Sequence, residues 1–186
     1  ITNVIATLRG STNPERVYVV SGHIDSRATD VLDFDSEQPG ADDDASGVAV
    51  IMELARVLSK RQPEATIVFT AVAGEEQGLF GSGFQATTYK AAGTDIQGMF
   101  SNDIVGSSTA DDGLRDRHTI RMFAEGVPTA ETAAQGATRR AVGGETDGVS
   151  RQLARFGKSV AENDETDLRI RFVYRRDRYL RASDHV

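Results

Sequence analysis

Apolar residues are spaced along the chain in two ways, which predict strands and helices in turn. The continuous apolar run at residues 17–20 and the largely apolar segment 65–73 are typical of strands covered on both faces. Residues 45–59 instead carry apolar side chains at three- and four-residue steps, which predicts a helix with an acidic residue at its start. Similar patterns predict helices over 80–91 and 148–162, and strands over 3–8, 98–105, 119–124 and 168–174.

Polar, turn-forming residues separate these segments. Residues 11–15 are expected to form a turn, residues 27–40 a surface loop, and residues 126–147, rich in Gly, Thr and Ala, a long mobile loop. Strands that alternate with helices predict an α/β protein, a three-layer α/β/α sandwich around a mixed, mostly parallel sheet. A length of 186 residues fits one domain, and the sequence contains no internal repeat.

Composition narrows the possible partners. The net charge of −7 argues against general nucleic-acid binding, which needs a basic surface. No apolar run is long enough to cross a bilayer, and the first residues do not resemble a signal peptide. Because the chain has no cysteine, any metal must be bound by oxygen and imidazole nitrogen. The chain opens inside a strand-like segment and stops at Ser183-Asp184-His185-Val186, so we expect a fragment that is incomplete at its C-terminus.

Acidic and imidazole side chains follow the predicted strands where each strand ends. In open α/β sheets the carboxyl ends of the strands gather at one edge, where active sites form. A metal centre is therefore expected at this edge. The candidate residues are His23, Asp25, Asp43, Glu75, Glu76 and Asp103.

These residue types suit zinc chemistry. Neutral imidazole and carboxylates are zinc ligands, and the middle acid of Asp42-Asp43-Asp44 is well placed to bridge two ions. The pair Glu75-Glu76 offers one ligand and one general base, and Asp25 could accept the far N–H of the His23 imidazole. Taken singly, each has a plainer interpretation as a helix start, a cap, a turn or a surface residue. Their joint order along the chain favours the metal centre over the plainer interpretation.

Four segments carry a resemblance to a known family: SGHIDS, PGADDDASGVAVIMELARVL, IVFTAVAGEEQGLFGS and FSNDIVG. They resemble the co-catalytic zinc exopeptidases of the bacterial leucyl aminopeptidase type. That family also includes glutamate carboxypeptidase-like enzymes and glutaminyl cyclases. The resemblance covers about residues 1–106 and extends weakly to Ser183-Asp184-His185.

The resemblance implies a site with two Zn²⁺ ions. It gives His23 and Asp103 to one ion, Asp43 to both as a bridge, and Glu76 to the site as a further ligand. Glu75 is implied as the general base, Asp25 as the partner that orients His23, and the Asp43–Asp44 peptide as cis.

One histidine ligand of the family is missing and is expected beyond Val186. His185 is a less favoured substitute, because the resemblance places it in a structural or substrate-side segment. His118 is expected to be exposed, and Tyr179 is a candidate for an oxyanion-side hydroxyl. With one ligand absent, it remains open whether this chain is active by itself.

The resemblance implies a zinc aminopeptidase that acts on the N-termini of peptides. A zinc carboxypeptidase stays open, because Arg175, Arg176, Arg178 and Arg181 could bind a terminal carboxylate. A glutaminyl cyclase, which works with one zinc ion, and a non-catalytic binding module also stay open. Relatives in bacteria are usually exported, so the resemblance implies export. The sequence gives no indication of the oligomeric state.

Overall fold

A computed structural model describes residues 1–128, 130–163, 166–174 and 183–185. Contacts between Cα atoms divide the chain into two compact units. The first unit contains residues 1–107 and 183–185, and the second contains residues 108–182 and 186. The single catalytic domain expected from the sequence remains a prediction. Within the described residues, no helix is long and apolar enough to cross a membrane.

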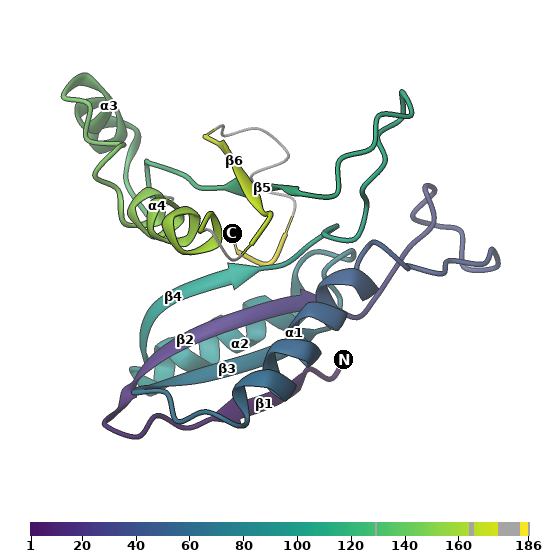
Figure 1. Ribbon diagram of the computed structural model, residues 1–186, viewed down its shortest axis with the longest axis horizontal. Coiled ribbons are helices and arrows are strands. Elements are labelled where there is room, and N and C mark those ends of the chain that lie inside the picture. Colours follow the sequence, from purple (N-terminus) through teal and green to yellow (C-terminus); the bar gives the residue numbers. More distant parts are fainter. Residues whose placement is uncertain (129, 164–165, 175–182, 186) are drawn as a thin grey trace. The chain divides into compact units, whose positions relative to one another are not determined.

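The first unit is built on a four-stranded sheet with the strand order β1-β3-β2-β4 (Figure 1). Strand β2 lies parallel to both β3 and β4, whereas β1 runs antiparallel to β3. The sheet is therefore mixed and mostly parallel, as predicted. The strands are β1 (Val4–Leu8), β2 (Asn13–His23), β3 (Ala65–Val72) and β4 (Asp95–Ser101).

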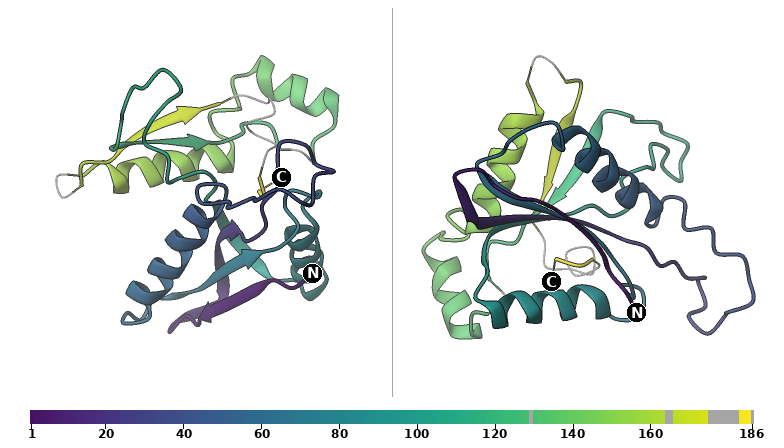
Figure 2. Two further views of the ribbon diagram at one scale, coloured as in Figure 1. Left: turned by 90° about the vertical axis from the view of Figure 1, so that its right-hand side faces the viewer. Right: turned by 90° about the horizontal axis from the view of Figure 1, so that it is seen from below.

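Two helices, α1 (Ala45–Leu58) and α2 (Phe80–Ala92), cover opposite faces of this sheet (Figure 2). Buried Val17, Val19 and Val68 form an apolar cluster against which Tyr89 of α2 and Met99 pack. The cluster joins the central strands to one helix, because alternate residues of a strand point to the same face. The predicted α/β/α layering is thus present in the first unit.

The second unit pairs two short parallel strands, β5 (Thr119–Phe123) and β6 (Arg169–Val173), and contains the helices α3 (Ala133–Ala141) and α4 (Val149–Ala161). Helix α4 packs on the strand pair through its basic side chains. Lys158 Nζ donates to the Ile170 carbonyl at 2.9 Å and lies over the Phe172 ring. Phe172 in turn stacks on Tyr174 at 5.2 Å between ring centroids.

Three of the sequence predictions need correction. Residues 126–147 do not form one long loop, because α3 lies within them. Its N-cap Thr132 and Gln135 form a reciprocal capping box, a local signal that the Gly- and Ala-rich composition concealed. Strand β4 begins and ends earlier than the predicted 98–105, and β2 begins at Asn13, inside the predicted turn.

Helix α2 approaches the sheet through a glycine. A Cβ on Gly81 would lie 2.3 Å from Asn3 Oδ1 and 2.5 Å from the Ala73 carbonyl oxygen. Asn3 also bridges the two segments, since it donates to the Gly81 carbonyl and accepts from the Ala73 N–H. Gly83, in the same helix, has no neighbour within 4 Å of the corresponding position. Close packing therefore requires glycine at position 81, whereas no steric contact requires it at position 83.

This contrast predicts opposite effects on the free energy of unfolding. Gly81→Ala places a methyl group against Asn3 and the backbone of Ala73, and should destabilise the protein by about 1–3 kcal/mol. Gly83→Ala adds only a better helix former and should stabilise it by up to about 1 kcal/mol. Urea unfolding followed by far-UV circular dichroism measures both, and a G81A protein as stable as G83A would contradict the packing argument.

Candidate metal centre

The parallel strands β2, β3 and β4 deliver the predicted residues to one edge of the sheet. His23 is the last residue of β2, Glu75 and Glu76 follow the end of β3, and Asp103 follows the end of β4. The strands are in register at this edge, where His23 lies opposite Val72, and the Asn102 N–H bonds to the Ser21 carbonyl at 2.8 Å. The predicted gathering of these residues is thus present.

The acidic triplet joins helix α1 to this edge. Asp44 is 1% exposed and caps the helix, because its Oδ1 accepts from the Gly47 N–H at 2.9 Å. Its Oδ2 accepts from the His23 N–H, also at 2.9 Å. The Asp43–Asp44 peptide is cis, as the resemblance implies. Asp42 holds the loop on its other side by accepting from the Gly106 N–H at 2.9 Å.

His23 is buried and held at both ring nitrogens. Nδ1 lies 3.0 Å from the backbone carbonyl of Asp25, and Nε2 lies 3.1 Å from Asp43 Oδ1. Asp25 was expected to orient the ring through its carboxylate, but that group is 4.0 Å away. The carbonyl does so instead, because the turn after β2 directs it at Nδ1. With Nδ1 protonated for this bond, Nε2 is the nitrogen available to a metal.

The Asp25 carboxylate has another task. Its two oxygens accept the backbone N–H groups of Gly74, Glu75 and Glu76, at 2.7, 3.2 and 3.0 Å. Asp25 therefore fixes the backbone that carries the two candidate glutamates, and does so from the segment that also orients His23. Its role is to position other groups.

His23, Asp43 and Asp103 bring three ligand atoms together. One atom from each lies within 4.8 Å of the others. One imidazole nitrogen and two carboxylate oxygens are a donor set that zinc accepts, at ligand distances of about 2.0–2.2 Å. A cation bound by both His23 Nε2 and Asp43 would lie between these two groups, which are 3.1 Å apart in the structure. The residues present therefore fit one zinc ion, with Asp43 half-exposed and able to reach a second.

The carboxylates around His23 are buried and crowded, and this environment raises the pKa values of Asp44 and Glu75. Burial raises the pKa of Asp44 to about 6. Burial, with the charges of Asp184 and Asp103, raises the pKa of Glu75 to about 7 although His23 lowers it. Burial lowers the pKa of His23, but Asp44, Glu75 and Asp103 outweigh it, so the net shift is upward. A carboxylate poised near neutrality is suited to act as a general base.

Glu76 stands apart from the three-ligand cluster. Its carboxylate is 12% exposed and accepts a hydrogen bond from Arg27 Nε at 2.5 Å. Sequence reasoning did not identify Arg27, although a basic residue close behind His23-Ile24-Asp25, in an acidic neighbourhood, was the available signal. In the described part of the chain Glu76 thus pairs with an arginine, and its expected role as a metal ligand stays a prediction.

Asp184 is a second residue that sequence reasoning missed. It is 6% exposed, and neither of its oxygens has a hydrogen bond of normal geometry among the described residues. Burial raises its pKa, while Ser82 and His23 act in the opposite direction. The neighbouring Ser183 bonds to Ser101 Oγ at 2.9 Å, which places this segment against the strand ends. The signal available in the sequence was only the motif Ser-Asp-His.

The remaining candidates are not part of the described cluster. His118 is exposed, as expected, and His185 is exposed as well. Neither joins the metal cluster among the described residues. Tyr179 and the basic set proposed for a terminal carboxylate fall outside the described residues. That set is Arg175, Arg176, Arg178 and Arg181.

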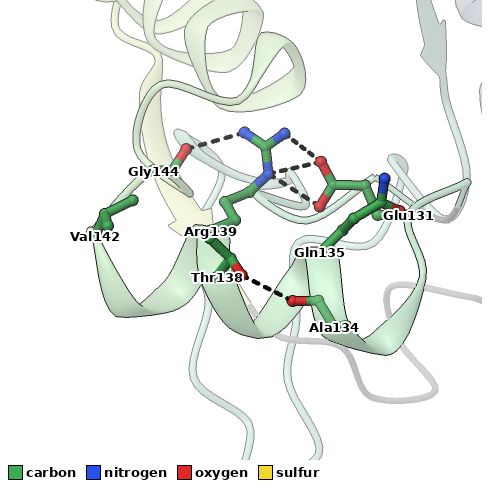
Figure 3. Close-up of a pocket in the computed structure, with 7 residues that line it drawn as sticks. All are labelled: Glu131, Ala134, Gln135, Thr138, Arg139, Val142 and Gly144. Carbon is green, nitrogen blue, oxygen red and sulfur yellow. Dashed lines mark hydrogen bonds and ion pairs between the residues drawn. The ribbon is translucent and has the colours of Figure 1, made fainter.

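A separate hollow of about 430 Å³ lies against α3 in the second unit (Figure 3). Arg139 lines it, but both oxygens of Glu131 already accept from Arg139 Nε, at 3.0 and 3.1 Å. Arg139 Nη1 also donates to the Gly144 carbonyl at 3.4 Å. Because the charged groups of this hollow neutralise each other, we assign the functional site to the strand ends.

Comparison with known proteins supports the fold and identifies the family. A solved structure of Legionella pneumophila LapA matches 98% of this chain and 41% of its own, with a TM-score of 0.66 and 20% identity, which shows the α/β fold. An aminopeptidase from Aneurinibacillus sp. strain AM-1 matches with a TM-score of 0.62 and 27% identity, over 98% of this chain and 35% of its own.

Residues 3–168 match Peptidase family M28, and the chain belongs to that family. A probable zinc metalloprotease of Leptosphaeria maculans is 56% identical over all 186 residues, and one of Pyricularia oryzae is 55% identical. The chain spans 43% of the former protein and 37% of the latter. The family resemblance expected from the four motifs is confirmed.

The raised pKa values predict how the stability of the metal-free protein depends on pH. Glu75 and Asp44 hold a proton more tightly when folded than when unfolded, so folding takes up protons. The free energy of unfolding should therefore rise as pH falls from 8 to 6, by up to about 1.4 kcal/mol per pH unit for each proton taken up.

Urea unfolding in the presence of a chelator measures this slope. Glu75→Gln removes one of the two groups, so the slope between pH 8 and 6 should become shallower in that variant. Glu53→Gln, on the exposed face of α1, serves as the control and should leave the slope unchanged. Stability that rises with pH over this window would contradict the assignment.

Proposed function

We propose that this chain carries the catalytic centre of a zinc-dependent aminopeptidase. The observation that carries the proposal is the convergence of His23, Asp43 and Asp103 beside Glu75, whose pKa is raised to about 7. One cluster supplies metal ligands and the neighbouring carboxylate can exchange a proton near neutral pH. This combination is what hydrolysis of an amide bond by water requires.

In this proposal His23, Asp43 and Asp103 hold one zinc ion, and Asp43 with Glu76 contributes to a second. Zinc, when bound, polarises a carbonyl and lowers the pKa of water toward neutrality. Glu75 takes the proton from water during the attack and then passes it to the leaving amine. Asp25 keeps Glu75 in place through the backbone N–H groups that its carboxylate accepts.

Charge favours an aminopeptidase over a carboxypeptidase. The described site is surrounded by carboxylates, which suit the ammonium group at the N-terminus of a peptide and repel a terminal carboxylate. The second ligand set that the resemblance implies, which shares Asp43 with the first, favours hydrolysis over cyclisation, because by the same resemblance a glutaminyl cyclase works with a single zinc ion. A binding module that had lost catalysis would not need Glu75 beside the cluster of His23, Asp43 and Asp103.

The role of Glu75 is tested in the complete protein. Glu75→Gln should lower kcat/KM for a substrate with a free N-terminus by about 10²–10⁴-fold, because the general base is lost. Its zinc content, measured by atomic absorption, should stay that of the unaltered protein. Glu53→Gln is the matched surface control. Retained activity in E75Q would refute the assigned base, and faster hydrolysis of N-acetylated peptides would refute an aminopeptidase.

Export of the protein is part of this proposal and rests on family resemblance alone. The complete protein, detected with an antibody, should then be found in the culture medium of the producing organism. A cytosolic enzyme serves as the control for cell lysis. Retention of the protein inside intact cells would contradict export without affecting the proposed chemistry.

A further inference from the structure

The contact between Arg27 and Glu76 differs from the other arginine–glutamate ion pairs of the described residues. Arg56 reaches both oxygens of Glu53, at 2.7 and 2.5 Å, and Arg139 reaches both oxygens of Glu131. Arg27, by contrast, donates a hydrogen bond from Nε to one oxygen of Glu76, Oε2, at 2.5 Å. In the described structure the second oxygen, Oε1, therefore stays available to another partner.

Glu76 is held at both of its ends by one short segment. Asp25 Oδ2 accepts its backbone N–H at 3.0 Å, and Arg27 holds its carboxylate. The same segment orients His23 through the Asp25 carbonyl at 3.0 Å. The turn that follows β2 thus serves candidate ligands from two different strand ends, His23 from β2 and Glu76 from β3.

A cation beside a metal ligand could act in two ways. It could compete with the metal for the glutamate, or it could hold the glutamate so that its free oxygen meets the metal. Competition would be best served by a contact to both oxygens, as in the pair of Arg56 with Glu53. The one-oxygen contact instead matches the hydrogen bonds that orient metal-binding carboxylates in proteins.

We propose that Arg27 is a positioning residue of the metal centre, which binds Glu76 through Oε2 and presents Oε1 to a divalent metal ion. The inference rests on the proposed function, since it takes Glu76 as a ligand. It extends that function by giving a role to a residue outside the ligand set. It also explains why a positively charged residue, Arg27, lies beside a proposed metal-binding site.

Two substitutions separate the hydrogen bond from the charge. The side-chain nitrogen of glutamine is as many bonds from Cα as Arg Nε, so Arg27→Gln keeps a donor there and loses the charge. Arg27→Met has a similar length and no donor. Zinc affinity is measured on the complete protein by competition with a chromogenic chelator. Zinc binding by the Glu76→Gln variant shows which zinc-binding step Glu76 contributes to, because that step should be weakened in this variant.

At that step R27M should bind zinc about 10–100-fold more weakly than the unaltered protein, and R27Q should restore most of the affinity. Replacement of zinc by Co²⁺ gives a visible spectrum that depends on coordination geometry, and only R27M should alter it. Arg56→Met, which removes an exposed pair on α1, is the matched control and should change neither result. Arg27→Leu replaces R27M if that variant does not fold.

Several outcomes would overturn the proposal. Tighter binding by both R27M and R27Q would mean that Arg27 competes with the metal. Equal weakness of both would mean that its charge acts, not its hydrogen bond. Unchanged binding in E76Q, with binding lost in His23→Ala, would refute Glu76 as a ligand while the centre at His23 stands. No zinc binding by the unaltered protein would refute the metal centre itself, and the role of Arg27 with it.

Discussion

The buried carboxylate of Asp44 is the constraint on which the site depends. One oxygen accepts the Gly47 N–H at the start of α1, and the other accepts the His23 N–H at the end of β2. A single side chain thus fixes the start of a helix relative to the end of a strand. Because Asp43 precedes it directly, this anchor also sets the distance between Asp43 and the His23 ring. Its raised pKa reflects the burial that this task requires.

Glycine makes the same junction sterically possible. A Cβ on Gly47 would lie 2.3 Å from the Asn102 carbonyl oxygen and 2.5 Å from Asp44 Oδ2. The helix start can therefore approach the strand ends only without a side chain there. Close approach brings Asp43, Asp103 and His23 into one cluster, at the cost of crowding acidic groups. A bound divalent ion would offset that crowding, and Arg27 contributes a positive charge at the edge of the cluster.

Much of the fold, and the gathering of the candidate ligands at one edge of the sheet, could be predicted from the sequence. Buried strands and the apolar stripe of α1 follow from local periodicity, and the carboxyl ends of parallel strands meet at one edge for any sequence that forms such a sheet. Helix α3 was missed because its signal is the Thr132–Gln135 capping box within a Gly- and Ala-rich segment. Arg27 and Asp184 were missed because a lone charged residue has no spacing to reveal its partner.

By itself, the sequence determined the layer order, the strand-end location of His23, Glu75, Glu76 and Asp103, the place of Asp43 before a helix, and the family. These depend on periodicity and on motifs that are continuous in the chain. Only the tertiary structure decided which atoms meet: the carbonyl of Asp25 on His23, its carboxylate on the backbone of Glu76, and Arg27 on one oxygen of Glu76. Hydrogen bonds depend on direction within a fraction of an ångström, and a sequence pattern specifies a face of an element but not the orientation of each group upon it.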